Sequence, residues 1–452
     1  MDLDLALPDA ARARRAELAR ALGESRALLF AGAAPPRNYA GAPYPFRASS
    51  HFLYFVGLPF ERAVLSIEGD DHALYLEPPA PDDALWHGPA PSLDAIEAAV
   101  GCPVRPLAEL AGAGAATLAA IDPATRARQE AALGRPVDPP SRGDEALADA
   151  VIALRLVHDE AAIAGLREAA EATVAAHLAG MAATRPGRRE HHVRAAMEAA
   201  ILERAMSTAY GSIVTVHGEV LHNHAHHHVL GAGDLLLADV GAESRGGWAG
   251  DVTRTWPVSG AFSPTQRAFY EVVLDAQARA IAAVRPGARY RDVHLAASHA
   301  LAEGLVALGV LRGDPEELVA DGVHALLFPH GVGHLLGLDV HDMEDLGDRA
   351  GYAPGRARST QFGLSYLRLD RDLVPGMAVT IEPGLYQVDA ILRDPHLARV
   401  AGDRLDRAAL ARFSDVRGIR IEDDVLVTDA GSEVLTAALP KAAADVEACV
   451  SA

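Results

Sequence analysis

The chain has 452 residues, which is too many for one small hydrophobic core, so we expect two domains. Half of the residues are hydrophobic and 23% are charged, a balance typical of globular proteins that argues against wholesale disorder. The 61 acidic residues outnumber the 41 basic ones, and the resulting net charge of −20 disfavours nucleic acid and anionic membranes as partners.

The same sequence indicates a cytoplasmic protein. Its two cysteines, Cys102 and Cys449, form no disulfide framework and suit a reducing compartment. The first residues are acidic and then basic, without the apolar segment of a signal peptide. We find no apolar run long enough to span a bilayer, so we expect no membrane partner.

In chain order, the sequence predicts short strands first and alanine-rich helices later. Strands are expected over residues 51–58, 63–67 and 72–76, with turn residues between them. A long helix is expected over 145–183, because Leu154, Val157, Ile163 and Leu166 recur at helical spacing. Further helices are predicted over 193–206, 264–284 and 293–308, alternating with glycine-punctuated strands. We place the domains at residues 1–155 and 156–452.

An apolar strand that begins at Leu235 ends on an acidic residue, Asp239, and a second acid, Asp251, follows a Gly-Gly turn. A hairpin centred near Arg245 would place the two aspartates opposite each other, where like charges are destabilising. Either a divalent cation lies between them or one of them is protonated. Alternatively, the register differs by one residue and one aspartate faces solvent. The hairpin alone leaves these interpretations open.

Downstream segments add further candidate ligands. The stretch FPHGVGHLLGLDVHD holds His330, His334 and His341, which is more than a lone core histidine would explain. It does not match a helical HExxH zinc motif, because glycines flank the histidines and no glutamate follows the first one. Glu382 ends the strand MAVTI, and Glu422 lies in GIRIEDDVLV. Since unpaired buried charge is very costly, such carboxylates in buried strands point to bound metal.

The predicted ligand set is Asp239, Asp251, His334, Glu382 and Glu422. Four carboxylates offer more oxygens than one ion needs, which favours two divalent ions roughly 3.5–4 Å apart. A mostly oxygen set with one imidazole suits Mn²⁺ best, with Co²⁺ or Zn²⁺ as alternatives.

The order of these motifs, with the settings HGVGH, EPGLY and GIRIEDD, resembles the pita-bread metallopeptidases, and within them aminopeptidase P and prolidase, the Xaa-Pro peptidases. The segment FRASSHFLYFVGLPFERAVLSI is similar to part of the N-terminal domain of aminopeptidase P. The resemblance implies an α/β (α+β) fold. A small mixed N-terminal domain would precede a catalytic domain with a curved antiparallel sheet flanked by helices.

The resemblance also implies roles for individual residues. Asp251 and Glu422 would bridge the two metals, and a bridging hydroxide would be the nucleophile. Glu382 would act as a ligand and as the catalytic proton shuttle. Three histidines would line the substrate pocket as catalytic residues: His222, His330 and His341. Two arginines would complete it, Arg420 by holding a ligand carboxylate and Arg368 by matching an arginine that binds the substrate carboxylate in prolidases. The charged segment 342–363 is expected to form a loop at the mouth.

The expected substrate is a peptide with proline at its second position, cleaved by an Xaa-Pro aminopeptidase. The alternative is a prolidase restricted to dipeptides, which Arg368 and the segment DAILRDPHLARV would fit. Two further classes with this fold are less favoured, because both lack the metal ligands: a non-catalytic peptide-binding or protein-binding module, and a metal-free amidinohydrolase of the creatinase type. From the family we also expect a homodimer or homotetramer.

Overall fold

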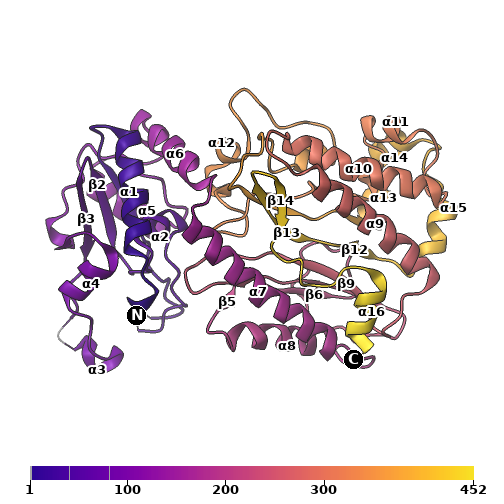
Figure 1. Ribbon diagram of the computed structural model, residues 1–452, viewed down its shortest axis with the longest axis horizontal. Helices are drawn as coiled ribbons and strands as arrows, with labels where there is room; N and C mark the ends of the chain where they lie inside the picture. The colour runs from indigo at the N-terminus through magenta and orange to yellow at the C-terminus, as the bar shows by residue number, and fades with distance from the viewer. Residues whose placement is uncertain (1–2, 40, 81, 452) are drawn as a thin grey trace. The chain divides into compact units, whose positions relative to one another are not determined.

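The computed structural model describes residues 3–39, 41–80 and 82–451, and the chain forms two compact units, Met1–Leu156 and Val157–Ala452. Each unit combines helices with β-strands (Figure 1). Among the described residues, no helix has both the length and the apolar character needed to cross a membrane.

The N-terminal unit is built on a mixed sheet with the strand order β1-β2-β3-β4. The first three strands pair antiparallel, and β4 runs parallel to β3. Leu28, Val64 and Tyr75 from three of these strands belong to one buried core cluster. The elements are α1 (Pro8–Leu22), β1 (Ala27–Phe30), α2 (Ser50–Val56), β2 (Val64–Glu68), β3 (Asp71–Leu76), α3 (Asp83–His87), α4 (Leu93–Val100), β4 (Val104–Pro106), α5 (Pro123–Leu133) and α6 (Arg142–Arg155).

The strand predicted over residues 51–58 is wrong, because this segment forms helix α2. Every residue of α2 is buried, so its sequence carries no amphipathic period that would separate a helix from a buried strand. Arg14 and Arg15 donate to the carbonyl oxygens of Tyr54 and Phe55 near the end of α2, at 3.1 and 2.7 Å. These contacts stabilise a helix end that has few partners of its own.

The single helix predicted over 145–183 is also wrong: it is two helices, α6 and α7 (Glu160–Ala183). The side chain of Asp159 caps α7 by accepting a hydrogen bond from the backbone of Ala162 at 2.8 Å. Val157, which we counted in the helical pattern, lies between the helices and is 43% exposed. A strong N-cap therefore started a new helix inside an apparently continuous pattern.

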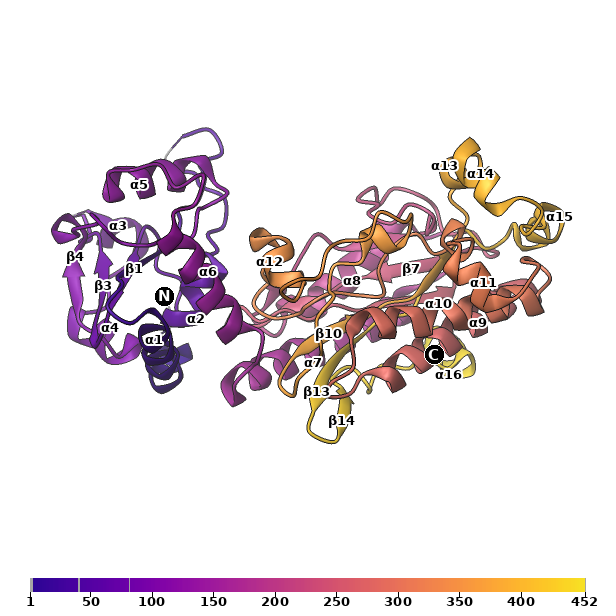
Figure 2. The same cartoon turned by 90° about the horizontal axis from the view of Figure 1, so that it is seen from above.

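The C-terminal unit holds two helix pairs and several short antiparallel sheets (Figures 1 and 2). Helices α7 and α8 pack against each other and contact β5, β6 and β8, whereas α9 packs against α10 and contacts β10, β11 and β12. The remaining helices are α8 (Glu190–Leu202), α9 (Pro264–Ala283), α10 (Tyr290–Ala307), α11 (Pro315–Ala320), α12 (Asp348–Gly351), α13 (Asp389–Leu392), α14 (Pro395–Ala401), α15 (Arg407–Leu410) and α16 (Ala443–Ser451). The strands are β5 (Ser207–Thr208), β6 (Ile213–Thr215), β7 (Leu235–Asp239), β8 (Ala242–Glu243), β9 (Thr253–Pro257), β10 (Ala378–Ile381), β11 (Gly384–Tyr386), β12 (Gly418–Arg420), β13 (Asp423–Thr428) and β14 (Gly431–Val434).

Strand β9 connects the sheet β6-β7-β9 to the segment that contains β12 and β13. The Thr255 hydroxyl donates to the carbonyl oxygen of Arg420 at 3.1 Å, and the backbone amide of Glu422 donates to the carbonyl oxygen of Thr253 at 3.0 Å. Arg254 is fully buried and donates to the carbonyl oxygen of Glu422 at 2.5 Å and to the carboxylate of Asp423 at 2.7 Å. Hydrogen bonds to charged groups are among the stronger ones in proteins, so this junction is well fixed.

Candidate metal centre

One cavity of about 440 Å³ in the C-terminal unit holds every side chain that the sequence analysis selected. The selected residues that line it are His222, Asp239, Asp251, His330, His334, His341, Arg368, Glu382, Arg420 and Glu422. Their positions in the chain span two hundred residues, so the fold, and not local sequence, brings them together.

The hairpin carries its two aspartates in a register that differs from our prediction. Asp239 pairs with Thr253, whereas we placed it opposite Asp251. The ladder continues to a bridge between Glu243 and Ala249, which centres the turn one residue later than Arg245. The resulting shift of two residues keeps both aspartates on one face, as diagonal neighbours. Neither faces solvent, since their side chains are 13% and 7% exposed.

A tyrosine lies between the two aspartates. The hydroxyl oxygen of Tyr210 is 2.5 Å from Oδ1 of Asp239 and 2.6 Å from Oδ1 of Asp251. Burial raises the pKa of Tyr210 well above its ordinary value, and both carboxylates raise it further, so the hydroxyl stays protonated. Because it has one proton, it donates to one carboxylate at a time.

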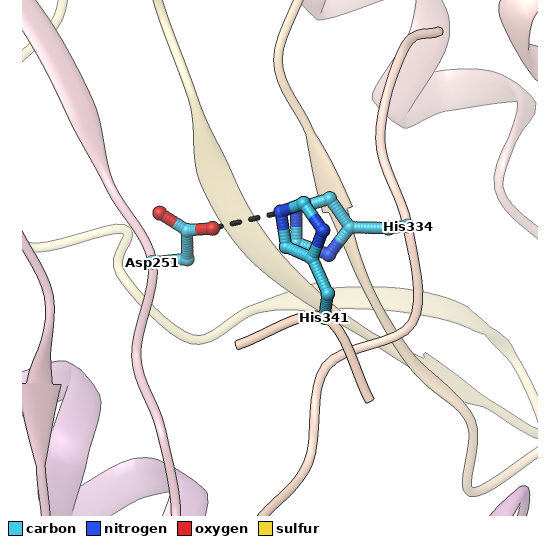
Figure 3. A group of neighbouring side chains, drawn as sticks. All are labelled: Asp251, His334 and His341. Atoms are coloured by element: carbon cyan, nitrogen blue, oxygen red, sulfur yellow. Dashed lines mark ion pairs between the residues drawn. The ribbon is translucent and has the colours of Figure 1, made fainter. Parts of the chain in front are cut away.

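The other acidic and histidine side chains come from segments next to β10, β12 and β13. Glu382 follows β10, Glu422 lies between β12 and β13, and His334 lies in an irregular segment whose neighbour Leu335 bridges to β10. Nε2 of His334 is 3.4 Å from Asp251 and 3.6 Å from Glu382. Figure 3 shows the His334 ring beside that of His341, facing Asp251; the ring centroids are 4.0 Å apart.

Three groups of these side chains have ligand atoms close enough to hold a metal ion. In each group the ligand atoms lie within 4.8 Å of one another. The groups are Asp239 with Asp251 and Glu422, His334 with Glu382 and Glu422, and Asp251 with His334 and His341. Carboxylate oxygens with imidazole nitrogens form a donor set that fits divalent metal ions.

Electrostatics also favour a cation here. Burial, followed by repulsion from Asp239, raises the pKa of Asp251 to about 7. Burial raises the pKa of Glu382 to about 8; Arg420 opposes this shift and Asp251 adds to it. Burial, with repulsion from Asp251 and Glu382, raises the pKa of Glu422 well above its ordinary value. A bound cation removes the repulsion and lets these groups ionise.

Arg420 fixes the inner wall of the cavity. Its guanidinium donates to the carboxylate of Asp239 at 2.6 Å, to the hydroxyl of Thr253 at 2.8 Å and to that of Tyr386 at 3.1 Å. Thr253 in turn donates to Glu422 at 2.7 Å. One buried arginine therefore orients two of the acidic side chains through direct and relayed hydrogen bonds.

The histidines of the wall have clear partners as well. Nε2 of His330 is 2.9 Å from the Tyr386 hydroxyl, and its Nδ1 lies 3.7 Å from Glu382. Burial lowers the pKa of His330 to about 3 and that of His334 to about 4, so both rings are neutral at pH 7. Burial also lowers the pKa of His222. A neutral imidazole can bind a metal ion or accept a proton.

The outer wall comes partly from the charged segment 342–363, where Arg358 and Phe362 line the cavity. This segment, expected as a loop, contains one short 3₁₀-helix, Glu344–Leu346, and the short helix α12. Arg368 also lines the cavity, and its guanidinium contacts the carboxylate of Glu344 at 2.6 and 2.7 Å.

Residues 164–429 match metallopeptidase family M24, and residues 11–121 match the N-terminal domain of aminopeptidase P. The chain belongs to metallopeptidase family M24. It is 34% identical to a probable Xaa-Pro aminopeptidase of Uncinocarpus reesii, over 90% of this chain and 86% of that protein. It is also 34% identical to Xaa-Pro aminopeptidase 1 of Streptomyces coelicolor, over 97% of this chain and 86% of that one.

Among solved structures, this M24 chain is similar to aminopeptidase PepP of Pseudomonas aeruginosa. The TM-score is 0.80 at 29% identity, with 99% of each chain covered. The protein is therefore a metallopeptidase, with an aminopeptidase P N-terminal domain and a pita-bread M24 domain, as the sequence motifs predicted.

Our motif analysis gave no role to two residues near this M24 site, Tyr210 and Asp424. Tyr210 lies in a loop between β5 and β6, outside any recognisable spacing. Asp424 accepts a hydrogen bond from the backbone amide of Asp251 at 3.2 Å, and burial raises its pKa well above the ordinary value. We quoted Asp424 within the EDD motif but gave it no role. Its position in a strand, two residues after the proposed ligand Glu422, is the signal that could have found it.

Proposed function

We propose that this M24 peptidase is an Xaa-Pro aminopeptidase, which releases the first residue of a peptide whose second residue is proline. The observation that carries the proposal is the convergence of all ten motif-derived side chains on one cavity. The similarity to proteins named Xaa-Pro aminopeptidases, over at least 90% of this chain, gives it further support.

We assign two metal positions to the cavity. Asp251, Glu422 and His334 each belong to two of the three ligand groups; of these, the two carboxylates have two oxygens each, which supports bridging roles for Asp251 and Glu422. Asp239, His334 and Glu382 would complete the set. We expect Mn²⁺, with Co²⁺ or Zn²⁺ as alternatives, because hard oxygen donors outnumber the imidazole. When bound, the ions supply Lewis acidity and lower the pKa of water.

The chain's own residues would then bind the peptide and move protons. A carboxyl oxygen of Glu382 takes the proton lost by the attacking water and gives it to the departing proline nitrogen, which has no hydrogen of its own in the peptide. Nδ1 of His330 lies 3.7 Å from that carboxylate, and Nε2 of the same ring forms a hydrogen bond with the Tyr386 hydroxyl. His222 and His341 would steady the scissile carbonyl group as negative charge develops on its oxygen.

The remaining assignments come from the helical sequence pattern, the cysteine content and, for the assembly, the family resemblance. We propose that the catalytic domain begins at residue 156 and that the protein acts in the cytoplasm as a homodimer or homotetramer. Analytical ultracentrifugation at micromolar concentration tests the assembly: a monomer would contradict it.

A paired assay with added Mn²⁺ tests the activity. We expect hydrolysis of an Xaa-Pro-Xaa tripeptide and loss of that hydrolysis in Asp251→Ala, since Asp251 belongs to two ligand groups. Cleavage of the Xaa-Pro dipeptide alone would make the protein a prolidase. Activity that survives Asp251→Ala, or none on either substrate, would contradict the metal-centre assignment.

A further inference from the structure

A carboxylate–guanidinium pair closes part of the cavity rim. Nη1 of Arg368 donates to Oε1 and Oε2 of Glu344 at 2.6 and 2.7 Å. Nδ1 of His341 lies 3.0 Å from Oε2 of the same carboxylate. Arg368 lines both the main cavity and an adjoining cavity of about 160 Å³ that Glu344 lines as well. The pair therefore lies at the edge of the proposed substrate site.

The other guanidinium groups on the wall also have acidic partners. Among the described residues, the arginines that line the cavity are Arg358, Arg368 and Arg420. Arg420 contacts the carboxylate of Asp239 at 2.6 Å. Arg358 contacts the carboxylate of Asp348 at 2.5 Å and the carbonyl oxygen of Leu367 at 2.7 Å. An incoming carboxylate must therefore compete with a resident one at each of these cations.

The backbone fixes where the Glu344 side chain begins. The preceding residue, Met343, adopts a left-handed conformation with φ of 60°, which is unfavourable for a residue with a side chain, and that side chain is buried. Glu344 then starts the 3₁₀-helix Glu344–Leu346. Because packing holds this turn, the carboxylate is presented to Arg368 by a defined backbone geometry.

We propose that Glu344 is a specificity-determining residue that occupies Arg368 in place of a substrate carboxylate and so selects peptides that continue beyond proline. The inference rests on the proposed Xaa-Pro aminopeptidase function. A dipeptide carries its free carboxylate on the proline itself, so binding to Arg368 brings it against Glu344. In a longer peptide the carboxyl carbon of the proline is part of a neutral peptide bond, so the Glu344 carboxylate does not repel it.

The test compares Ala-Pro, its C-terminal amide and Ala-Pro-Ala with the Mn²⁺-loaded protein and Glu344→Gln. The substitution removes the resident charge at nearly constant size. We expect the KM for Ala-Pro to fall about five-fold, the scale set by one partly exposed ion pair. The KM values for the amide and the tripeptide should stay within about two-fold, since neither places a carboxylate on the proline.

Two further variants separate a local effect from a general one. Asp348→Asn removes one negative charge beside Arg358, which stays held by the carbonyl oxygens of Ser365 and Leu367 at 3.1 and 2.7 Å, and it leaves Glu344 on Arg368. It should therefore leave the preference between Ala-Pro and its amide unchanged. In an Arg368→Gln background, Glu344→Gln should no longer change the KM for Ala-Pro, because the guanidinium through which it acts is absent.

Failure of the inference and failure of the activity look different. If the unaltered protein cleaves none of the three substrates, the proposed function fails and the inference falls with it. If it cleaves Ala-Pro-Ala but Glu344→Gln leaves the ratio of KM values unchanged, or Asp348→Asn changes it equally, the inference alone is overturned. If Glu344→Gln is inactive, dissociation constants of Ala-Pro and its amide from calorimetry give the same comparison.

Discussion

At the scale of single residues, Tyr210 shows how a neutral side chain organises an acidic site. Its hydroxyl contacts Asp239 and Asp251 together, and its raised pKa keeps the proton in place. A protonated donor between two carboxylates holds them in one orientation without adding charge. The side chain therefore prearranges Asp239 and Asp251, the two aspartates that we propose as metal ligands.

Replacing Tyr210 with phenylalanine should weaken metal binding while the fold persists. Loss of a partner that orients ligands typically costs 10–100-fold in metal affinity, so we expect a decrease of about that size for Mn²⁺. Calorimetric titration of the chelator-treated protein measures it. Tyr366→Phe is the matched control, because Tyr366 lines the same cavity and its ring packs on Phe362. Equal affinities in both variants would contradict the role assigned to Tyr210.

At the scale of elements, the hairpin that carries Asp239 and Asp251 depends on close approach of the backbone segments beyond β7. A side chain at Gly241 would place its Cβ 1.8 Å from the carbonyl oxygen of Gly250 and 2.8 Å from the ring of Tyr210. No L side chain fits that space without moving one strand. The glycine therefore lets the chain segments of Asp239 and Asp251 run side by side.

Gly241→Ala should destabilise the protein by about 1–3 kcal/mol, the usual cost of overpacking, and should also weaken Mn²⁺ binding. Chemical denaturation and calorimetry measure the two effects. Gly233→Ala is the control, since an added Cβ there meets no atom within 4 Å. A Gly241→Ala protein as stable as the control would show that the hairpin adapts and would contradict this account.

An element could be predicted where polar and apolar residues alternate clearly along the sequence, and could not where all its residues are buried. Polar residues next to apolar runs revealed the strand that ends at Asp239 and the strand that ends just before Glu382. Register was harder, because pairing with Thr253 instead of Asp251 depends on turn length, which Gly246-Gly247 does not fix. Helix α2 was invisible, since a fully buried helix and a buried strand share one composition.

At the scale of the whole molecule, acidic and histidine side chains bias stability in opposite pH ranges. The raised pKa values of Asp251 and Glu382, about 7 and 8, mean that the metal-free folded chain keeps protons that the unfolded chain has lost. The pKa values of His330 and His334 are lowered to about 3 and 4. As pH falls below the ordinary histidine pKa of 6.5, these residues therefore take up protons in the unfolded chain before they do so in the folded chain.

From about pH 7.5, one unit above the ordinary histidine pKa of 6.5, up to pH 8 the acidic effect acts alone, because the histidines are then almost entirely neutral in both states. The free energy of unfolding of the metal-free protein should therefore fall as pH rises through this window. The slope is about 1.4 kcal/mol per pH unit for each extra proton retained. Thermal melts with chelator measure it. With Mn²⁺ the ligands are ionised and the decrease should disappear; the same decrease with metal would contradict this assignment.

The candidate site was more predictable from sequence than the fold that carries it. All five proposed ligands and the pocket histidines came from motifs, because metal chemistry restricts residue type at each position. The residues that orient them were harder to find. Tyr210 and Glu344 belong to no sequence motif, and their roles depend on where the fold places a hydroxyl or a carboxylate. Several residue types in many segments could supply such a group.

Sharing Glu422 and Asp251 between ligand groups has a thermodynamic consequence for the two metal positions we propose. Occupancy of one position fixes and neutralises carboxylates that the other also uses, so the two binding steps are linked by reciprocal free-energy coupling. Each apparent dissociation constant then belongs to the pair. A curve of activity against metal concentration should consequently report cooperativity between neighbouring ions, and exchange of one ion for another element should change the affinity for its neighbour.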